Sequence, residues 1–239
     1  MTPIVLCETD TGKKIIDGEI SAVLSSAPFY TLDLAARYVC HVLDEDDVRP
    51  YLDFVAKGLK APSYIVDSVV NGDYAKRPIV DVRKVSVTDA ELATIAKVDG
   101  GMKKKVLFTL LCLAKYYDKY RGTTSGWENR SVEEVSALAN VSLNKERLCY
   151  LLCDLKESGL ISFSNRVSST SVHVEFIEDG NTAVDISDMR NLGWQYERLN
   201  GKRFSVCKKC GALFPYTDKH VFCRDCREEP KIEIENPWY

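Results

Sequence analysis

The chain has 239 residues, of which 45% are hydrophobic and 28% are charged, and its formal net charge is −3. This is the composition of an ordinary soluble globular protein, long enough for two or three small domains. It is not the strongly basic composition that indicates nucleic-acid binding by charge alone. The longest nearly apolar stretch, Val106–Ala114, is far shorter than the ~20 residues of a membrane-spanning helix, so we expect no membrane segment.

The N-terminus and the cysteine distribution favour a cytoplasmic protein. Met1–Asp10 has no basic start and no sustained apolar segment, so no secretory signal is predicted. Five cysteines are scattered along the chain, and the last three fall within helical patterns among leucines, where we expect small buried side chains. These five are Cys7, Cys40, Cys112, Cys149 and Cys153.

Residues 1–85 predict a mostly helical N-terminal domain of unknown role. Pro3–Cys7 has the pattern of a strand, and Gly12 and Gly18 indicate turns. Three helical patterns follow, in the segments from the N-cap Thr31 to Val42, from Val48 to Leu59, and from Pro62 to Val70. The acidic run Asp44–Asp47 is interpreted as a helix start that complements the macrodipole, and an acidic functional patch is the alternative.

Residues 86–180 contain the clearest helical signals in the chain. Thr88 with Glu91 and Ser131 with Glu134 each form a capping box at the start of a helix. Between them, a helix that begins after Gly100-Gly101 is apolar nearly all round from Val106 to Tyr117, which predicts a central buried helix.

A further helix and two strands complete this segment. Leucines of Asn144–Glu157 recur at i, i+3, i+4 and i+7, and the pattern ends at Ser158-Gly159. Leu160–Phe163 and Ser171–Phe176 then alternate apolar and polar residues, which predicts a β-hairpin with a polar tip at residues 164–170. The order of buried helix, short helix, tight turn, helix and hairpin is typical of a winged helix-turn-helix.

The C-terminal region contains two Cys-x-x-Cys pairs separated by twelve residues: Cys207 with Cys210, and Cys223 with Cys226. This spacing predicts one closed, structural Zn²⁺ site with four thiolate ligands. Gly211 follows the second cysteine, where a tight turn often needs a positive φ. The alternatives are two disulfides or a redox pair, and replacement of one thiolate by His220.

Two resemblances extend these patterns. The segments Trp127–Ser131 and Gly159–Arg166 resemble the winged-helix modules of phage and mobile-element replication or regulatory proteins. With the connector Arg190–Tyr196 and the zinc ribbon, the chain also resembles a group of poorly characterised phage and integrative-element proteins of Gram-positive bacteria. These resemblances imply the architecture of residues 86–239 and say nothing about residues 1–85.

The predicted fold class is α+β, with a mostly helical N-terminal domain, a central winged helix-turn-helix and a C-terminal zinc ribbon. The expected boundaries are residues 1–85, 86–180, a connector helix within 181–203, and a ribbon with its tail over 204–239. The connector helix is predicted from Asp188 to Leu199, with Ser187 as its cap.

The second helix of a helix-turn-helix pair contacts base edges through its N-terminal residues, so this helix supplies most of the candidate DNA-binding residues. Arg166 at the hairpin tip is a candidate for entry into a minor groove or for a phosphate contact, and the lysine run before the buried helix is a candidate for contacts along the DNA backbone. The full set is Asn144, Lys145, Arg147, Tyr150, Arg166, Lys103, Lys104 and Lys105. The alternative is that these are ordinary solvated side chains. Basic residues beside the cysteines either offset the thiolate charge or contact phosphates: Lys208, Lys209, Arg224 and Arg227.

The function predicted from these features is DNA binding, of replication-initiation or regulatory type, with double-stranded DNA as the partner. The alternative is a protein-binding adaptor or inhibitor that acts through the acidic residues 1–85. No phosphate-binding glycine loop and no His-Glu-x-x-His motif is present, so no enzymatic activity is predicted. The sequence leaves open whether the chain forms a homodimer.

Overall fold

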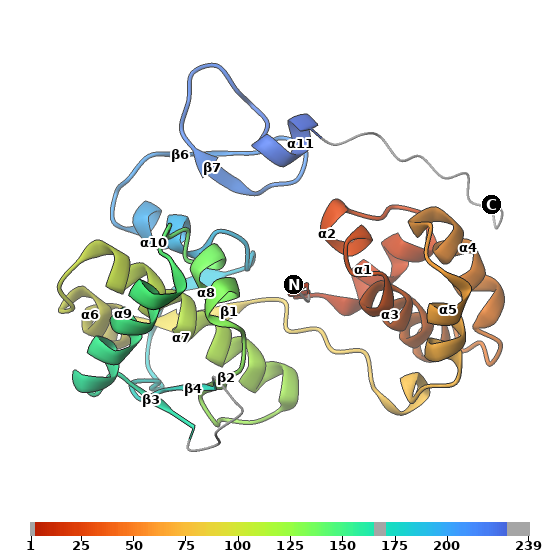
Figure 1. Cartoon of the computed structure of the whole chain (residues 1–239), viewed down its shortest axis with the longest axis horizontal. Coiled ribbons are helices and arrows are strands. Elements are labelled where there is room, and N and C mark those ends of the chain that lie inside the picture. The colour runs from red at the N-terminus through yellow and green to blue at the C-terminus, as the bar shows by residue number, and fades with distance from the viewer. Residues whose placement is uncertain (1–2, 165–170, 229–239) are drawn as a thin grey trace. The chain divides into compact units, whose positions relative to one another are not determined.

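The computed structural model describes residues 3–164 and 171–228 (Figure 1). Their contacts divide the chain into two compact units, of which the first holds residues 3–81 and Glu228, and the second holds residues 82–227. The described residues form helices and three small antiparallel sheets, an α+β structure as predicted.

The first unit is helical, and its core surrounds α3. Leu32, Leu34 and Val39 of this helix are fully buried, and α3 contacts every other helix of the unit. The helices are α1 (Glu8–Ile16), α2 (Ala22–Ser25), α3 (Pro28–His41), α4 (Arg49–Leu59), α5 (Ser63–Val70) and the 3-10 helix η1 (Tyr74–Lys76).

Three sequence predictions in this unit were wrong. Gly12 lies inside α1 rather than in a turn, because a helix packs there against α3: a Cβ at Gly12 would lie 2.6 Å from the Cβ of Tyr38. Thr31 lies within α3, which begins at Pro28. Pro3–Cys7 is not a strand, since only Cys7 makes a β-bridge, with Asp81.

A buried ion cluster ties the end of the first unit to its helices. The Arg37 guanidinium donates hydrogen bonds to both carboxylate oxygens of Glu8, at 2.6 and 2.8 Å, and to Asp33 at 3.2 Å. Glu8 also accepts a hydrogen bond from the backbone N–H of Val80. Because these charges are paired and hydrogen-bonded, their burial is tolerated, and removal of one partner would leave an uncompensated charge.

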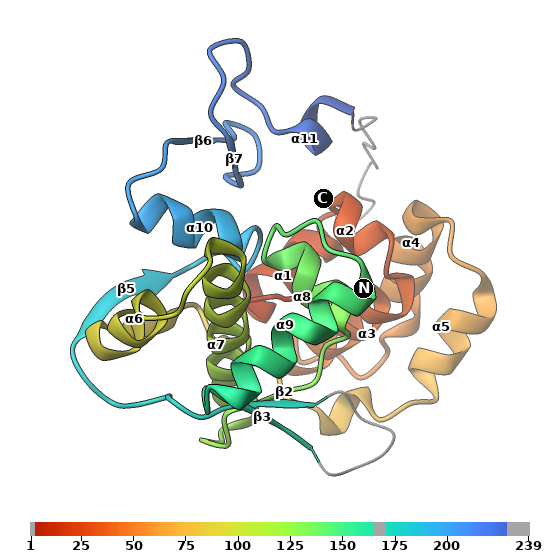
Figure 2. The same ribbon diagram turned by 60° about the vertical axis from the view of Figure 1, so that its left-hand side comes forward.

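The second unit is built on α7, the predicted central helix, whose residues Val106–Ala114 are all fully buried. Figure 2 shows α7 between α6 and α9. Both predicted capping boxes are present, at Thr88 and at Ser131. The helices of this unit are α6 (Asp89–Ala96), α7 (Gly101–Arg121), α8 (Val132–Leu138), α9 (Lys145–Glu157), α10 (Leu192–Leu199) and α11 (Arg224–Glu228).

The predicted hairpin is present as β3 (Ile161–Phe163) and β4 (Val172–Val174), with Ile161 opposite Val174. A strand that the sequence did not predict, β2 (Trp127–Glu128), pairs with the other side of β4 and gives the sheet order β2-β4-β3. The chain order is therefore α7, β2, α8, α9, β3, β4.

The segment 181–203 differs from the predicted connector. It contains β5 (Thr182–Ile186), which pairs antiparallel with β1 (Val85–Thr88). The connector helix α10 begins at Leu192 rather than Asp188, after Asn191 in a left-handed conformation. The third sheet is the hairpin of β6 (Phe204–Val206) and β7 (Leu213–Pro215).

Candidate functional site

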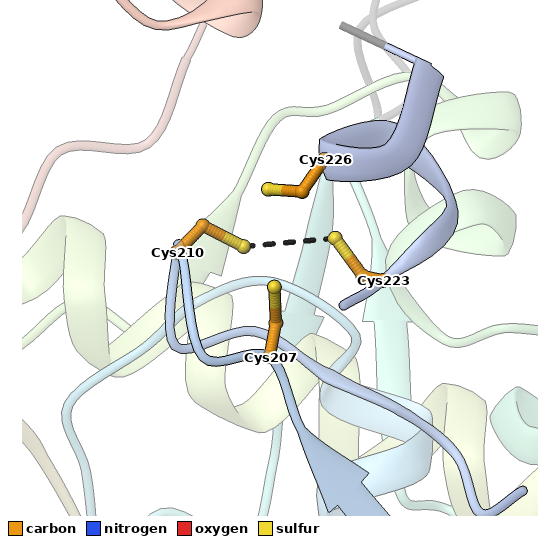
Figure 3. Close-up of side chains that lie close together, drawn as sticks. All are labelled: Cys207, Cys210, Cys223 and Cys226. Carbon is orange, nitrogen blue, oxygen red and sulfur yellow. Dashed lines mark hydrogen bonds between the residues drawn. The ribbon is translucent and has the colours of Figure 1, made fainter. Parts of the chain in front are cut away.

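The four C-terminal cysteines converge on one point (Figure 3). Their Sγ atoms all lie within 4.8 Å of one another, and the Cys210 and Cys223 sulfurs are 3.7 Å apart. That separation is far longer than the about 2.05 Å of a disulfide bond, and all four are free thiols. The cluster is therefore compatible with a metal site.

The β6–β7 hairpin and the start of α11 position these thiols. Cys207 directly follows β6, and its backbone N–H donates to Ala212 while its C=O accepts from Gly211, which closes the first turn. Gly211 has a φ of +74°, so the glycine predicted after the second cysteine is required by its backbone conformation. His220 is exposed and is not part of the converging set in the described residues.

Backbone hydrogen bonds prepare one thiol for metal binding. Burial raises the pKa of the Cys207 thiol, but N–H groups of Cys223, Cys210 and Lys209 outweigh this effect and hold the pKa at about 6. Burial and the neighbouring sulfurs raise the pKa of Cys223 and of Cys226. A cation at the centre would favour the thiolate form of all four cysteines.

The cysteine cluster has a very small apolar core. Cys207, Phe214 and Cys223 are buried, and Trp194 of α10 packs against them. Trp194 also stacks on Phe204, with ring centroids 6.0 Å apart. Few apolar contacts therefore hold this segment together, and α10 contributes one of them through Trp194.

The same helix supports the turn between α8 and α9. The Asn140 side-chain amide donates from Nδ2 to Oδ1 of Asn191 at 2.9 Å, and Oδ1 of Asn140 accepts from the Trp194 backbone N–H at 3.2 Å. At Gly193 the backbones nearly touch, because a Cβ there would lie 1.7 Å from the carbonyl oxygen of Ala139. α10 thus contacts the turn and the cysteine cluster through adjacent residues.

The candidate DNA-binding residues at the start of α9 are all exposed, and three make contacts within the chain, of which one is a long hydrogen bond from the Tyr150 hydroxyl to Glu146 at 3.5 Å. Asn144 caps α9, since its side-chain oxygen accepts the Arg147 backbone N–H at 2.9 Å. Lys145 pairs with Glu133 of α8 at 3.3 Å. The Arg147 side chain is exposed, and Tyr150 is 64% exposed one turn further on.

The lysine run before the buried helix does not form a free basic row. Lys103 pairs with Asp154 of α9 at 2.9 Å. Lys104 donates to the Ala96 carbonyl oxygen at the end of α6, and Lys105 donates to the Asn140 carbonyl oxygen, each at 2.9 Å. Arg166, the candidate at the hairpin tip, lies outside the described residues.

The expectation that three cysteines are buried was wrong for two of them. Cys112 is fully buried in α7, and burial raises the pKa of its thiol. Cys149 and Cys153 are exposed, although they lie among leucines in sequence. α9 buries one stripe only, consisting of Leu148, Leu151, Leu152 and Leu155, and both cysteines lie beside that stripe.

Sequence reasoning also missed a set of exposed apolar side chains in the segment that holds the four cysteines. Val206, Tyr216, Val221 and Phe222 are each between 40% and 51% exposed. The signal for them was available as several apolar residues in a short segment that has almost no core to bury them.

Comparison with family models, with curated proteins and with solved structures gave no match to this chain. In the part of the chain that the structure describes, none of the helices has both the length and the apolar composition needed to cross a membrane.

Proposed function

We propose that the four-cysteine cluster binds one Zn²⁺ in a closed, structural site. Zinc–sulfur bonds of about 2.3 Å in a tetrahedron require sulfurs about 3.8 Å apart, close to the 3.7 Å between Cys210 and Cys223. Thiolates are the soft ligands that zinc prefers, and four of them complete its coordination. Because the surrounding core is so small, the metal would supply much of the free energy that folds this segment.

Elemental analysis of the purified protein tests the site. We expect one zinc per chain, reduced zinc content in a Cys223→Ser variant, and full content in a Cys149→Ser variant, since Cys149 is exposed on α9. Chelation should also change the fluorescence of Trp194, which packs against the cluster. Full zinc content in Cys223→Ser, or none in the parent, contradicts the proposal.

We further propose that residues 82–227 bind double-stranded DNA as a winged helix-turn-helix, with the zinc ribbon as an auxiliary module. The observation that carries this proposal is the placement of α9: it follows α8 after a short turn, its first turn is exposed, and it packs against β3 of the hairpin. In a helix-turn-helix this helix lies in the major groove, and the hairpin corresponds to the wing.

Within that helix, Arg147 is the residue best placed to contact a base. Its guanidinium can bind guanine through two hydrogen bonds, and its side chain is exposed. Lys145 would first have to leave Glu133, although an exposed pair of this kind contributes less than about 1 kcal/mol. A base contact by Asn144 would break the cap of α9, at a cost of about 1 kcal/mol.

Binding to duplex DNA over a range of salt concentrations tests this function. The affinity should fall steeply with salt, because phosphate contacts release counterions. Arg147→Ala should weaken binding at preferred sites by about 1–3 kcal/mol. Lys57→Ala, which removes an exposed cation on α4 of the first unit, should have no comparable effect. Binding that does not depend on salt, or equal binding by the Arg147 variant, argues against this role of α9.

A second candidate function is favoured by one feature of the first unit. The four acidic residues Asp44–Asp47 are all exposed, and only Asp47 acts near a helix start, where it accepts the Arg49 N–H. They directly follow two exposed apolar residues, Val42 and Leu43. Such a mixed acidic and apolar surface suits a basic protein partner, as the adaptor hypothesis requires. The absence of duplex binding by the zinc-loaded protein would favour this candidate.

A further inference from the structure

Basic side chains are concentrated beside the cysteine cluster. Residues 3–81 carry eight basic and thirteen acidic side chains, and residues 82–201 carry sixteen of each. Residues 202–228 carry seven basic and three acidic side chains, a formal charge of +4, and residues 229–239, outside the described residues, carry one basic and three acidic side chains. Four thiolates around one Zn²⁺ contribute about −2, so residues 202–228 keep about +2 when loaded.

The exposed apolar side chains lie among these cations. The backbone N–H of Lys208 donates to the Val221 carbonyl oxygen at 3.0 Å, so the loop before the second cysteine pair lies against the first pair. Five exposed residues lie within two positions of this contact along the chain, and we call them the ribbon surface: Val206, Lys208, Lys219, Val221 and Phe222. The Phe222 ring is 40% exposed although phenylalanine is usually buried.

A second aromatic group lies at the other end of the same hairpin. The Arg203 guanidinium lies over the Tyr216 ring, 4.5 Å from its centroid, and Tyr216 is 47% exposed. A guanidinium that is stacked on a ring presents a flat, charged face. The segment therefore combines flat groups with cations at both ends of the hairpin.

We propose that the ribbon surface binds single-stranded nucleic acid, with a base stacked on Phe222 and with Lys208 and Lys219 contacting the backbone phosphates. Proteins that bind single strands without sequence preference combine basic side chains with exposed aromatic rings, because every base has a π-face. In a duplex the base faces are covered by their neighbours, so an exposed ring has no face on which to stack. The pairing of aromatic and basic side chains therefore favours a single strand over a duplex.

This activity is separate from the proposed duplex binding by α9. The exposed residues of α9 include Glu146, Asp154 and Glu157 as well as cations, so its charge is balanced. The ribbon surface carries a net positive charge and belongs to different elements. The two activities can therefore be removed independently.

Fluorescence anisotropy with the zinc-loaded full chain tests the proposal. The probe is a labelled oligothymidylate about 16 nucleotides long, compared with a duplex of the same length. Phe222→Ala should weaken binding of the single strand by about 5- to 150-fold, the range given by 1–3 kcal/mol per stacked base. Lys208→Gln and Lys219→Gln should each reduce the salt dependence of log K by up to about 0.7.

Two controls make the result specific. Tyr64→Ala removes a 67% exposed aromatic side chain from α5 of the first unit and should leave binding unchanged. Zinc content and the thermal unfolding midpoint of Phe222→Ala should match the parent, because the removed ring lies at the surface.

Three results would overturn the proposal. The first is unchanged binding of the single strand by folded Phe222→Ala. The second is the absence of single-strand binding by the parent. The function proposed for α9 would still be supported in that case if the parent binds duplex DNA in a salt-dependent way and Arg147→Ala does not. The third is competition by polyglutamate as effective as competition by unlabelled oligothymidylate, which would identify an acidic polypeptide as the ligand.

Discussion

Replacement of Glu128 by glutamine should make the stability of the second unit less sensitive to a rise in pH from about 5 to about 8. Glu128 lies in β2 and is completely buried. One of its carboxylate oxygens accepts the Arg130 backbone N–H at 2.8 Å, and the other has no hydrogen-bond partner in the described residues. Ionisation of this carboxyl group therefore leaves a poorly compensated negative charge in the core.

The size of the effect follows from the pKa. Burial raises the pKa of Glu128 from 4.5 to about 7, despite the opposing effects of the Arg130 N–H and guanidinium. The folded state then holds this proton up to about pH 7, whereas the unfolded chain releases it near 4.5. Stability from this group is fully present below the unfolded pKa and is lost as the pH rises through the folded pKa. Above about pH 7, the total loss of unfolding free energy from this group is about 3 kcal/mol.

Denaturant unfolding of parent and Glu128→Gln over a series of pH values measures this effect. Fluorescence of Trp127 and Trp194 reports on the second unit, which contains both residues. Glutamine keeps the size of the side chain and an oxygen for the Arg130 N–H, but it cannot ionise. Relative to the variant, the parent should lose about 2–3 kcal/mol of unfolding free energy between about pH 5 and pH 8.

The comparison with the variant isolates the contribution of Glu128 from those of the other ionisable groups of the protein. A matched control is Glu157→Gln, which removes an exposed carboxylate from α9 and should leave the pH profile unchanged. If the stability difference between parent and Glu128→Gln is the same at both pH values, the buried carboxyl group is not neutral in the folded protein and the reasoning fails.

Two further predictions concern packing and thiol access. Gly193→Ala should destabilise the second unit by about 2 kcal/mol or more, since its Cβ would overlap the Ala139 carbonyl group. Gly101→Ala, the control, adds a methyl group in open space and should be neutral or slightly stabilising. Thermal unfolding compares the two variants, and equal midpoints would contradict the close approach at Gly193. A thiol reagent should label Cys149 and Cys153 rapidly in the native protein, and Cys112 only on unfolding. Peptide mapping by mass spectrometry identifies the labelled cysteines. Rapid labelling of Cys112 would contradict its burial.

Features specified by short segments of sequence were predicted well. The two capping boxes each need only a side chain and a residue three positions later, and both formed. The nearly all-apolar stretch of α7 is buried as expected. The cysteine cluster belongs to the same class, because the β6–β7 hairpin holds the first pair in its turn and the start of α11 holds the second pair a few residues later.

Features that depend on distant parts of the chain were missed. β5 has an unremarkable sequence and becomes a strand by pairing with β1, about a hundred residues earlier. Gly12 lies inside α1, where the close approach of Tyr38 leaves no room for a Cβ, so the glycine reflects packing rather than a turn. The lysines at 103 and 105 looked like a free basic run, but their partners, Asp154 and Asn140, come from elements that only the fold brings near.

The position of α10 explains why the two proposed sites belong to one unit. Its first residues meet the α8–α9 turn through Asn140 and through the backbone contact at Gly193. Trp194, the next residue, closes the small core of the cysteine cluster, and Asn191 donates to the Leu213 carbonyl oxygen of β7. A change in the cluster that moves Trp194 must therefore act on a helix that also supports the turn before α9. If the cluster binds Zn²⁺ as proposed, the metal site and the turn before α9 both contact this one short helix, so an effect of the metal on α9 would need no longer path through the core.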